Sequence, residues 1–290
     1  IARKWGYEKK KVLCSQAQVL FPTENFWGKT IGPRCASDTE SLRKGYEPLP
    51  LKEMSFDLVE YNNIEALEAK FKANPNIVAF HVEPIQANAG IIIPDEGYLK
   101  KVRELCTKYN VLMIVDEVFM GLGRTGKLFC YQWEDIRPDV ITIAKSLSGG
   151  FYPVSAVLAD DHIMSVLSPS DIDSTYCANP MAAHICRTAV QVLIEEGMIE
   201  NSYQLGFILK EELEKIKNKY SFVKEVRAGK GLVAGFELDN AQNCWIMTKL
   251  LLEYGMLIKP GKRNSLRFHP PLVITEEELR YGISLIEKAC

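Results

Sequence analysis

The sequence predicts an α/β fold in which a large domain with a mainly parallel sheet precedes a smaller domain. Continuous apolar strands alternate with stretches of helical spacing over the first half of the chain, as in parallel sheets covered by helices. From about residue 181, long amphipathic helices and short strands follow, which is typical of an α+β domain. The chain has 290 residues, enough for both. We expect the large domain over residues 1–194 and the small C-terminal α+β domain over residues 195–290.

The elements of the large domain follow from local pattern. Ala2 to Trp5 are predicted as the last turn of a helix that stops at Gly6. Residues 26–57 are rich in Gly, Pro, Ser and Asp and are predicted as a long irregular stretch. Helices are expected at 63–72 and 96–109, and strands at 17–21, 77–82, 111–115, 140–144 and 154–159.

The elements from about residue 181 onward are predicted in the same way. Thr275 is the expected N-cap of the last helix, and Glu278 completes a capping box with it. Helices are expected at 181–195, 199–219 and 276–288, and strands at 231–238, 256–260 and 265–268.

Composition argues against several classes of protein. Lys plus Arg is 35 and Asp plus Glu is 37, so the net charge of −2 argues against nucleic acid or an anionic membrane as a partner. No apolar run approaches the roughly 20 residues of a membrane span. The eight cysteines form no CxxC pair, and none of the four histidines sits at zinc-ligand spacing to a cysteine. We expect free thiols in a reducing compartment and no metal.

Asp116 follows the apolar strand Val111–Val115. A carboxylate at the end of a buried strand is costly unless a positive group meets it, and open α/β sheets bind ligands at this edge. Two alternatives are an Asp that caps the next loop and a Walker B strand. Gly121–Lys127 fits GxxxxGK, but Leu128 replaces the Ser or Thr that holds magnesium, and the segment follows the acidic strand when it should precede it. The P-loop alternative is therefore rejected.

Lys145 follows the next apolar strand and precedes Gly149-Gly150. A lysine buried there could lose its proton near neutral pH and bond covalently to a carbonyl group. The alternative is a surface lysine whose stem packs on the apolar strand. A buried acid and a buried lysine on neighbouring strand ends favour pyridoxal 5'-phosphate. This cofactor needs a lysine for its aldehyde and an acid for its pyridinium nitrogen.

Motifs spread in order over nearly the whole chain resemble those of class III aminotransferases, and within that family those of the ornithine aminotransferases. They are E-P-I-Q at 83–86, D-E-V at 116–118, G-L-G-R-T-G at 121–126, R-P-D at 137–139, K-S-L-S-G-G at 145–150, Y-P-V-S-A-V-L at 152–158, S-T-Y at 174–176, L-R-F at 266–268 and P-P-L at 270–272. The resemblance implies a fold type I transferase that depends on pyridoxal phosphate and whose large domain binds the cofactor.

The resemblance also implies cofactor-binding roles. Lys145 would carry the cofactor and then move the proton, and Asp116 would pair with its ring nitrogen. Phe26 and Val118 would pack on the two faces of the ring. Ser174 and Thr175 would reach the phosphate bound by a neighbouring subunit, which implies a homodimer with shared active sites.

The reaction implied for small-molecule substrates moves the δ-amino group of ornithine to 2-oxoglutarate, and gives glutamate semialdehyde and glutamate. Arg267 would bind a substrate carboxylate, and Trp27 would line the substrate pocket. The mitochondrial matrix or the cytoplasm is the expected compartment.

Three site positions depart from the family pattern. Phe119 stands where the family has a Gln that hydrogen-bonds the cofactor's phenolic oxygen. Asn88 stands where the family has the Glu that covers the arginine matching Arg267 while ornithine reacts; Asn88 can hydrogen-bond that arginine but cannot neutralise it. Lys29 stands where the family has an Arg that would hold ornithine's α-carboxylate with a planar fork of donors.

The family's N-terminal third is absent, including the Gly-rich turn and helix N-terminus that cradle the phosphate. Residues 1–5 resemble the end of that helix, and we expect that the chain begins inside a larger protein. Two alternatives stay open: a catalytically degenerate homologue that serves as a binding or scaffold subunit, and a related class III enzyme with another amino donor.

Overall fold

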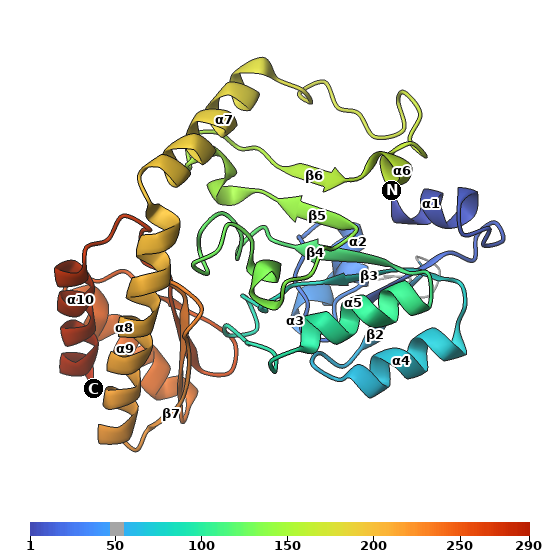
Figure 1. Cartoon of the computed structure of the whole chain (residues 1–290). Coiled ribbons are helices and arrows are strands. Elements are labelled where there is room, and N and C mark those ends of the chain that lie inside the picture. The colour runs from blue at the N-terminus through green and yellow to red at the C-terminus, as the bar shows by residue number, and fades with distance from the viewer. Residues whose placement is uncertain (47–54) are drawn as a thin grey trace. The chain divides into compact units, whose positions relative to one another are not determined.

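The structure, a computed structural model, describes residues 1–46 and 55–290 (Figure 1). The chain forms two compact units. Unit 1 comprises Ile1–Pro84, Pro94–Val118 and Tyr131–Thr188, and unit 2 comprises Ile85–Ile93, Phe119–Cys130 and Ala189–Cys290. Unit 2 thus includes two segments that precede residue 194 in the chain, and the division into domains at residues 194 and 195 stays a prediction.

Unit 1 contains a six-stranded sheet in the order β2-β1-β3-β4-β5-β6, and only the edge strand β6 is antiparallel to its neighbour. This confirms the α/β class and the mainly parallel sheet. The strands are β1 (Gln18–Pro22), β2 (Phe56–Val59), β3 (Ile77–Val82), β4 (Leu112–Asp116), β5 (Val140–Ile143) and β6 (Ala156–Ala159). Because β3, β4 and β5 are parallel, their carboxyl ends meet at one edge of the sheet.

Helices pack on both faces of this sheet. One apolar cluster joins the sheet to α4 (Ile64–Ala73) and α5 (Tyr98–Lys108), which lie side by side in Figure 1. The second cluster joins the other face to α1 (Ala2–Glu8). The remaining helical segments that begin in unit 1 are α2 (Ile31–Cys35), α3 (Glu40–Arg43), α6 (Asp161–Met164), α7 (Pro180–Glu195) and the 3-10 turn η2 (Lys145–Ser148).

Two predictions for unit 1 were wrong. Gly6 does not stop a helix, because α1 runs through it to Glu8. A β-carbon at Gly6 would lie 2.3 Å from Cγ1 of Val78, so the glycine lets α1 approach β3 closely. The stretch 26–57 is not wholly irregular, since it contains α2, α3 and the first residues of β2. Residues 47–54 of that stretch lie outside the described part of the chain.

Unit 2 contains a four-stranded antiparallel sheet in the order β7-β8-β10-β9, covered by helices. The strands are β7 (Val223–Arg227), β8 (Ala234–Leu238), β9 (Lys259–Pro260) and β10 (Ser265–Phe268), and the helices are α8 (Met198–Lys219), α9 (Ala241–Glu253) and α10 (Glu276–Ala289). The predicted capping box is confirmed: the N–H of Glu278 donates to Thr275 Oγ1, and the N–H of Thr275 donates to Glu278 Oε2. The elements β7 and α9 were not predicted.

Gly126, in the segment that resembles a P-loop, and Gly231 both serve packing inside unit 2. A β-carbon at Gly126 would lie 2.7 Å from the Cα of Tyr203, and one at Gly231 would lie 2.4 Å from the carbonyl carbon of Thr125. Close backbone contact therefore explains Gly126 and Gly231 without a phosphate. Across residues 1–46 and 55–290, no helix combines the length and apolar character needed to cross a membrane. The same residues contain no cluster of metal-ligating side chains.

Candidate active site

Asp116 ends β4 at the carboxyl edge of the sheet, and its side chain is 10% exposed. Its Oδ1 accepts a hydrogen bond of 2.9 Å from the N–H of Val118, and its Oδ2 lies 3.9 Å from Nε2 of His81. Burial lowers the pKa of His81, so the imidazole is neutral at neutral pH. Among the described residues, no Lys or Arg forms an ion pair with Asp116. A buried carboxylate that has no Lys or Arg partner is suited to a ligand with a positively charged nitrogen.

Lys145 begins η2 directly after β5. Asp116 pairs with Thr142 in the sheet, so Lys145 lies three residues beyond the partner of Asp116 at the same edge. The expected burial of Lys145 is wrong: the residue is exposed, because the chain leaves the strand before it. Its φ of 48° is uncommon for a residue other than glycine, and Gly149 and Gly150 continue the turn with φ of 61° and 88°. The exposed Lys145 and the buried Asp116 thus follow adjacent strands at the same edge of the sheet.

The loop after β1 is held by buried polar contacts. The side-chain amide of Asn25 donates to the carbonyls of Pro22 and Ala36 at 2.8 and 2.9 Å. The N–H of Phe26 donates to Oε1 of Glu83, a buried residue just past the end of β3, at 3.2 Å. These contacts hold the backbone at Phe26, whose side chain is half-buried.

Trp27 and Lys29 lie on the same loop and line one small hollow of about 10 Å³ with Phe26. The indole of Trp27 stacks on Phe21 at 4.7 Å, and no residue of the described chain accepts a hydrogen bond from its buried Nε1. Lys29 is exposed. The structure therefore brings together the three residues of this loop that the resemblance implies.

Arg267 on β10 is 5% exposed and belongs to unit 2. Its Nη1 donates to Oδ1 of Asn88 at 2.9 Å and to the carbonyl of Ala87 at 3.2 Å. Its Nε is buried without a hydrogen-bond partner in the described chain, and no described carboxylate forms an ion pair with it. Burial lowers the pKa of Arg267, but a guanidinium still carries its charge at neutral pH. The group is thus suited to bind a carboxylate.

The other implied site residues make contacts of their own. Phe119 packs on the ring of His269 inside unit 2, with the ring centroids 5.5 Å apart. Ser174 and Thr175 are exposed in the segment before α7, where Ser174 Oγ accepts a hydrogen bond of 3.4 Å from the N–H of Tyr176. Their roles toward a cofactor stay predictions.

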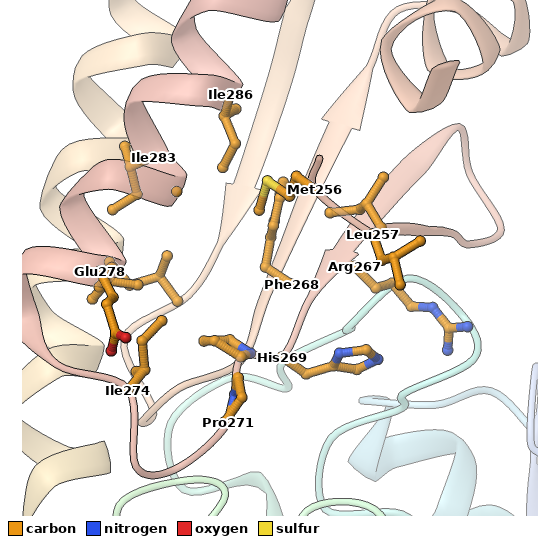
Figure 2. Close-up of a pocket in the computed structure, with 15 residues that line it drawn as sticks. Met256, Leu257, Arg267, Phe268, His269, Pro271, Ile274, Glu278, Ile283 and Ile286 are labelled. Atoms are coloured by element: carbon orange, nitrogen blue, oxygen red, sulfur yellow. The ribbon is translucent and has the colours of Figure 1, made fainter. Parts of the chain in front are cut away.

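Unit 2 also contains a pocket of about 250 Å³ between β10 and α10 (Figure 2). In Figure 2 the guanidinium of Arg267 points away from Ile283 and Ile286, which line the opposite side. The carboxylate of Glu278 is used by the capping box of α10. The other lining residues are mainly apolar, so the pocket belongs to the packing of the small sheet against its helices.

From the sequence alone, no role in the site was assigned to His81 or Glu83. Both lie at the carboxyl end of β3, where His81 faces Asp116 and Glu83 holds Phe26. The available signal was the same one that marked Asp116, namely a titratable side chain at the end of an otherwise apolar strand.

Comparison with known proteins identifies the family. The model of the Aminotransferase class-III family matches residues 1–290. Two curated relatives are the mitochondrial ornithine aminotransferases of Drosophila melanogaster, 45% identical over 289 residues, and Rattus norvegicus, 42% identical over 291 residues. Each alignment covers 99% of this chain, which spans 65% and 64% of the two relatives.

Solved structures agree with this comparison. The ornithine aminotransferase of Toxoplasma gondii has a TM-score of 0.95 at 38% identity, over 99% of this chain and 68% of that one. Another structure of the Toxoplasma protein has pyridoxal phosphate at partial occupancy in its active site. The acetylornithine aminotransferase of Elizabethkingia anophelis has a TM-score of 0.85 at 38% identity, over 99% and 69% of the two chains. On the match along its whole length, the chain belongs to the class-III aminotransferase family.

Proposed function

We propose that this chain belongs to a pyridoxal-phosphate-dependent aminotransferase that moves the δ-amino group of ornithine to 2-oxoglutarate. The observation that carries the proposal is the placement of Asp116 and Lys145 at the ends of the adjacent strands β4 and β5. The names of the relatives support the choice of ornithine. The chain spans less than two thirds of the length of the curated relatives, so the activity of the whole protein is part of the proposal.

Class-III aminotransferases use pyridoxal phosphate, and the residues at the sheet edge fit it. When bound, the cofactor supplies an electron-withdrawing ring that labilises bonds at the substrate's amino carbon. The buried carboxylate of Asp116 would hold the ring nitrogen in its protonated form. The exposed amine of Lys145 would hold the aldehyde carbon and later move a proton at the substrate. Phe26 and Val118 would pack on the two faces of the ring.

Substrate binding is assigned to Arg267, Lys29, Asn88 and Trp27. Arg267 would form charge-assisted hydrogen bonds to a substrate carboxylate, because its Nε is unpartnered and no described acid neutralises it. Lys29 would bind a second carboxylate as a point charge. Asn88 would keep Arg267 in place without changing its charge.

A homodimer with shared active sites is also proposed. Large apolar side chains are exposed in the single chain: Tyr176 at 84% and Met181 at 65%, which follow Ser174 and Thr175 in the sequence, and Phe151 at 88%. Exposed apolar groups of this kind mark an interaction surface. Sedimentation of the purified protein should therefore give the mass of a dimer. For the compartment, either the mitochondrial matrix or the cytoplasm is proposed, in line with the eight free thiols.

The decisive experiment for the function locates the cofactor. The protein is incubated with pyridoxal phosphate and ornithine is withheld, the bound cofactor is fixed by borohydride, and the peptides are mapped. A single pyridoxyl group on Lys145 is expected, and Lys145→Ala should lose it while Lys127→Ala keeps it. Labelling at Lys127 or at scattered lysines would overturn the assignment. Transfer of the amino group from ornithine to 2-oxoglutarate is then assayed directly.

A further inference from the structure

His81 is a buried titratable residue that the proposed function leaves unused. It lies on β3, with its side chain 13% exposed, and its Nε2 faces Oδ2 of Asp116 at 3.9 Å. The imidazole packs against Phe21 at 5.2 Å and Trp27 at 5.9 Å, measured between ring centroids. Aromatic rings from β1 and the following loop therefore hold the imidazole beside the carboxylate.

The two oxygens of Asp116 have different surroundings. Oδ1 accepts the N–H of Val118, whereas Oδ2 is the oxygen toward His81. At 3.9 Å a neutral imidazole makes no hydrogen bond to Oδ2 and leaves it available. An imidazolium at the same place would attract Oδ2 strongly, because the pair is shielded from water.

Few other charges act on His81. Its packing partners on β1 and the loop, Phe21 and Trp27, carry no charge. Glu83 follows just past the end of β3, and its Oε1 accepts the N–H of Phe26. From β4, Asp116 is the charged group that raises the pKa of His81, while burial lowers it by more.

We propose that His81 is a positioning residue for Asp116. When the imidazole is neutral, it leaves the carboxylate of Asp116 open to a cationic ring nitrogen. When the imidazole is protonated, it occupies that carboxylate. This inference rests on the proposed function for the identity of the ligand. By linkage, protonation of His81 and binding of the cofactor weaken each other. Because burial holds the pKa of His81 below its ordinary value of 6.5, the carboxylate stays open at neutral pH and closes as the solution is acidified.

The first test needs no cofactor. The chain has four histidines, so ring-labelled histidine gives four resolvable NMR signals, and His81→Gln identifies the one of His81. Its midpoint should lie below 6.5 and fall by about one unit in Asp116→Asn, because the carboxylate that raises it is lost. The control Asp160→Asn removes a surface carboxylate that pairs with Arg137 and should leave the midpoint unchanged.

The second test adds pyridoxal phosphate to the folded protein, followed by circular dichroism of the bound cofactor. Saturation with the cofactor should lower the His81 midpoint further. On acidification, cofactor affinity should fall more in the parent than in His81→Gln. An unchanged His81 midpoint in Asp116→Asn, or identical pH profiles in His81→Gln and the parent, would overturn the inference. If Lys145 fails to retain the cofactor, the proposed function is overturned instead. The NMR titration of His81 in Asp116→Asn would still show whether the two side chains interact.

Discussion

The side-chain oxygen of Asn88 accepts one hydrogen bond of 2.9 Å from Arg267, and no carboxylate in the described chain neutralises that guanidinium. The sequence predicted that Asn88 could hydrogen-bond Arg267 without neutralising it, and the structure shows this contact. A buried guanidinium with an unused donor is ready for an anion, and its charge is present whichever substrate arrives.

Substrate preference should therefore have shifted. An uncompensated Arg267 favours a donor that brings a carboxylate to it, such as glutamate, over the ammonium end of ornithine. The double variant Asn88→Glu with Lys29→Arg should raise kcat/KM for ornithine by roughly fivefold more than kcat/KM for glutamate. Equal effects on both donors, or a parent protein already fast with ornithine, would show that other groups set the preference.

Asp116 should be essential for turnover. Replacement by Ala removes the only carboxylate proposed for the ring nitrogen and should slow transamination by at least about 100-fold. Single-turnover kinetics with glutamate would measure the effect, with Asp160→Ala as the surface control. Near-normal rates in Asp116→Ala would mean that the residue only caps the loop through Val118.

Arg267→Lys should weaken 2-oxoglutarate binding. Lysine keeps the charge but lacks the planar fork of donors, so we expect KM to rise by about tenfold with a smaller change in kcat. Arg280→Lys changes a surface guanidinium that pairs with Glu276 and should leave KM unchanged. An equal change in KM in Arg267→Lys and Arg280→Lys would argue against a substrate contact at Arg267.

Gly6→Ala should destabilise unit 1. The added methyl would lie 2.3 Å from Cγ1 of the fully buried Val78, so α1 must move away from β3, at a cost of about 1–3 kcal/mol in the free energy of unfolding. In Gly32→Ala the nearest atom is 3.5 Å away, in Trp27, and little change is expected. Urea denaturation of both variants measures the difference, and equal midpoints would refute the packing argument.

The local sequence pattern predicted those elements whose apolar residues are the ones that the fold buries. The strands β3 and β10 have their predicted bounds, since β3 is apolar apart from His81 and β10 is a short run of buried residues. Helix α9 was missed because apolar residues such as Trp245 and Leu252 are exposed on it, which blurs a one-sided pattern. Gly6 was misjudged because its reason lies in Val78, which is far away in the sequence.

The candidate site was predictable to the extent that it follows from strand ends. Asp116 was placed correctly because a carboxylate after an apolar strand marks the sheet edge. The exposure of Lys145 was not predictable, because it depends on a turn with positive φ. The contact of His81 with Asp116 joins two strands whose register no local pattern reveals.

The antiparallel pairing of β5 with the edge strand β6 has a consequence for local unfolding. Ile143 and Ala156 are paired in the sheet, so the segment between them, which carries Lys145, is closed at its base like the loop of a hairpin. Opening that base requires β6 to leave the edge of the sheet. The amide protons of β6 and of residues 144–155 should therefore exchange with solvent as one cooperative unit, ahead of the central strands.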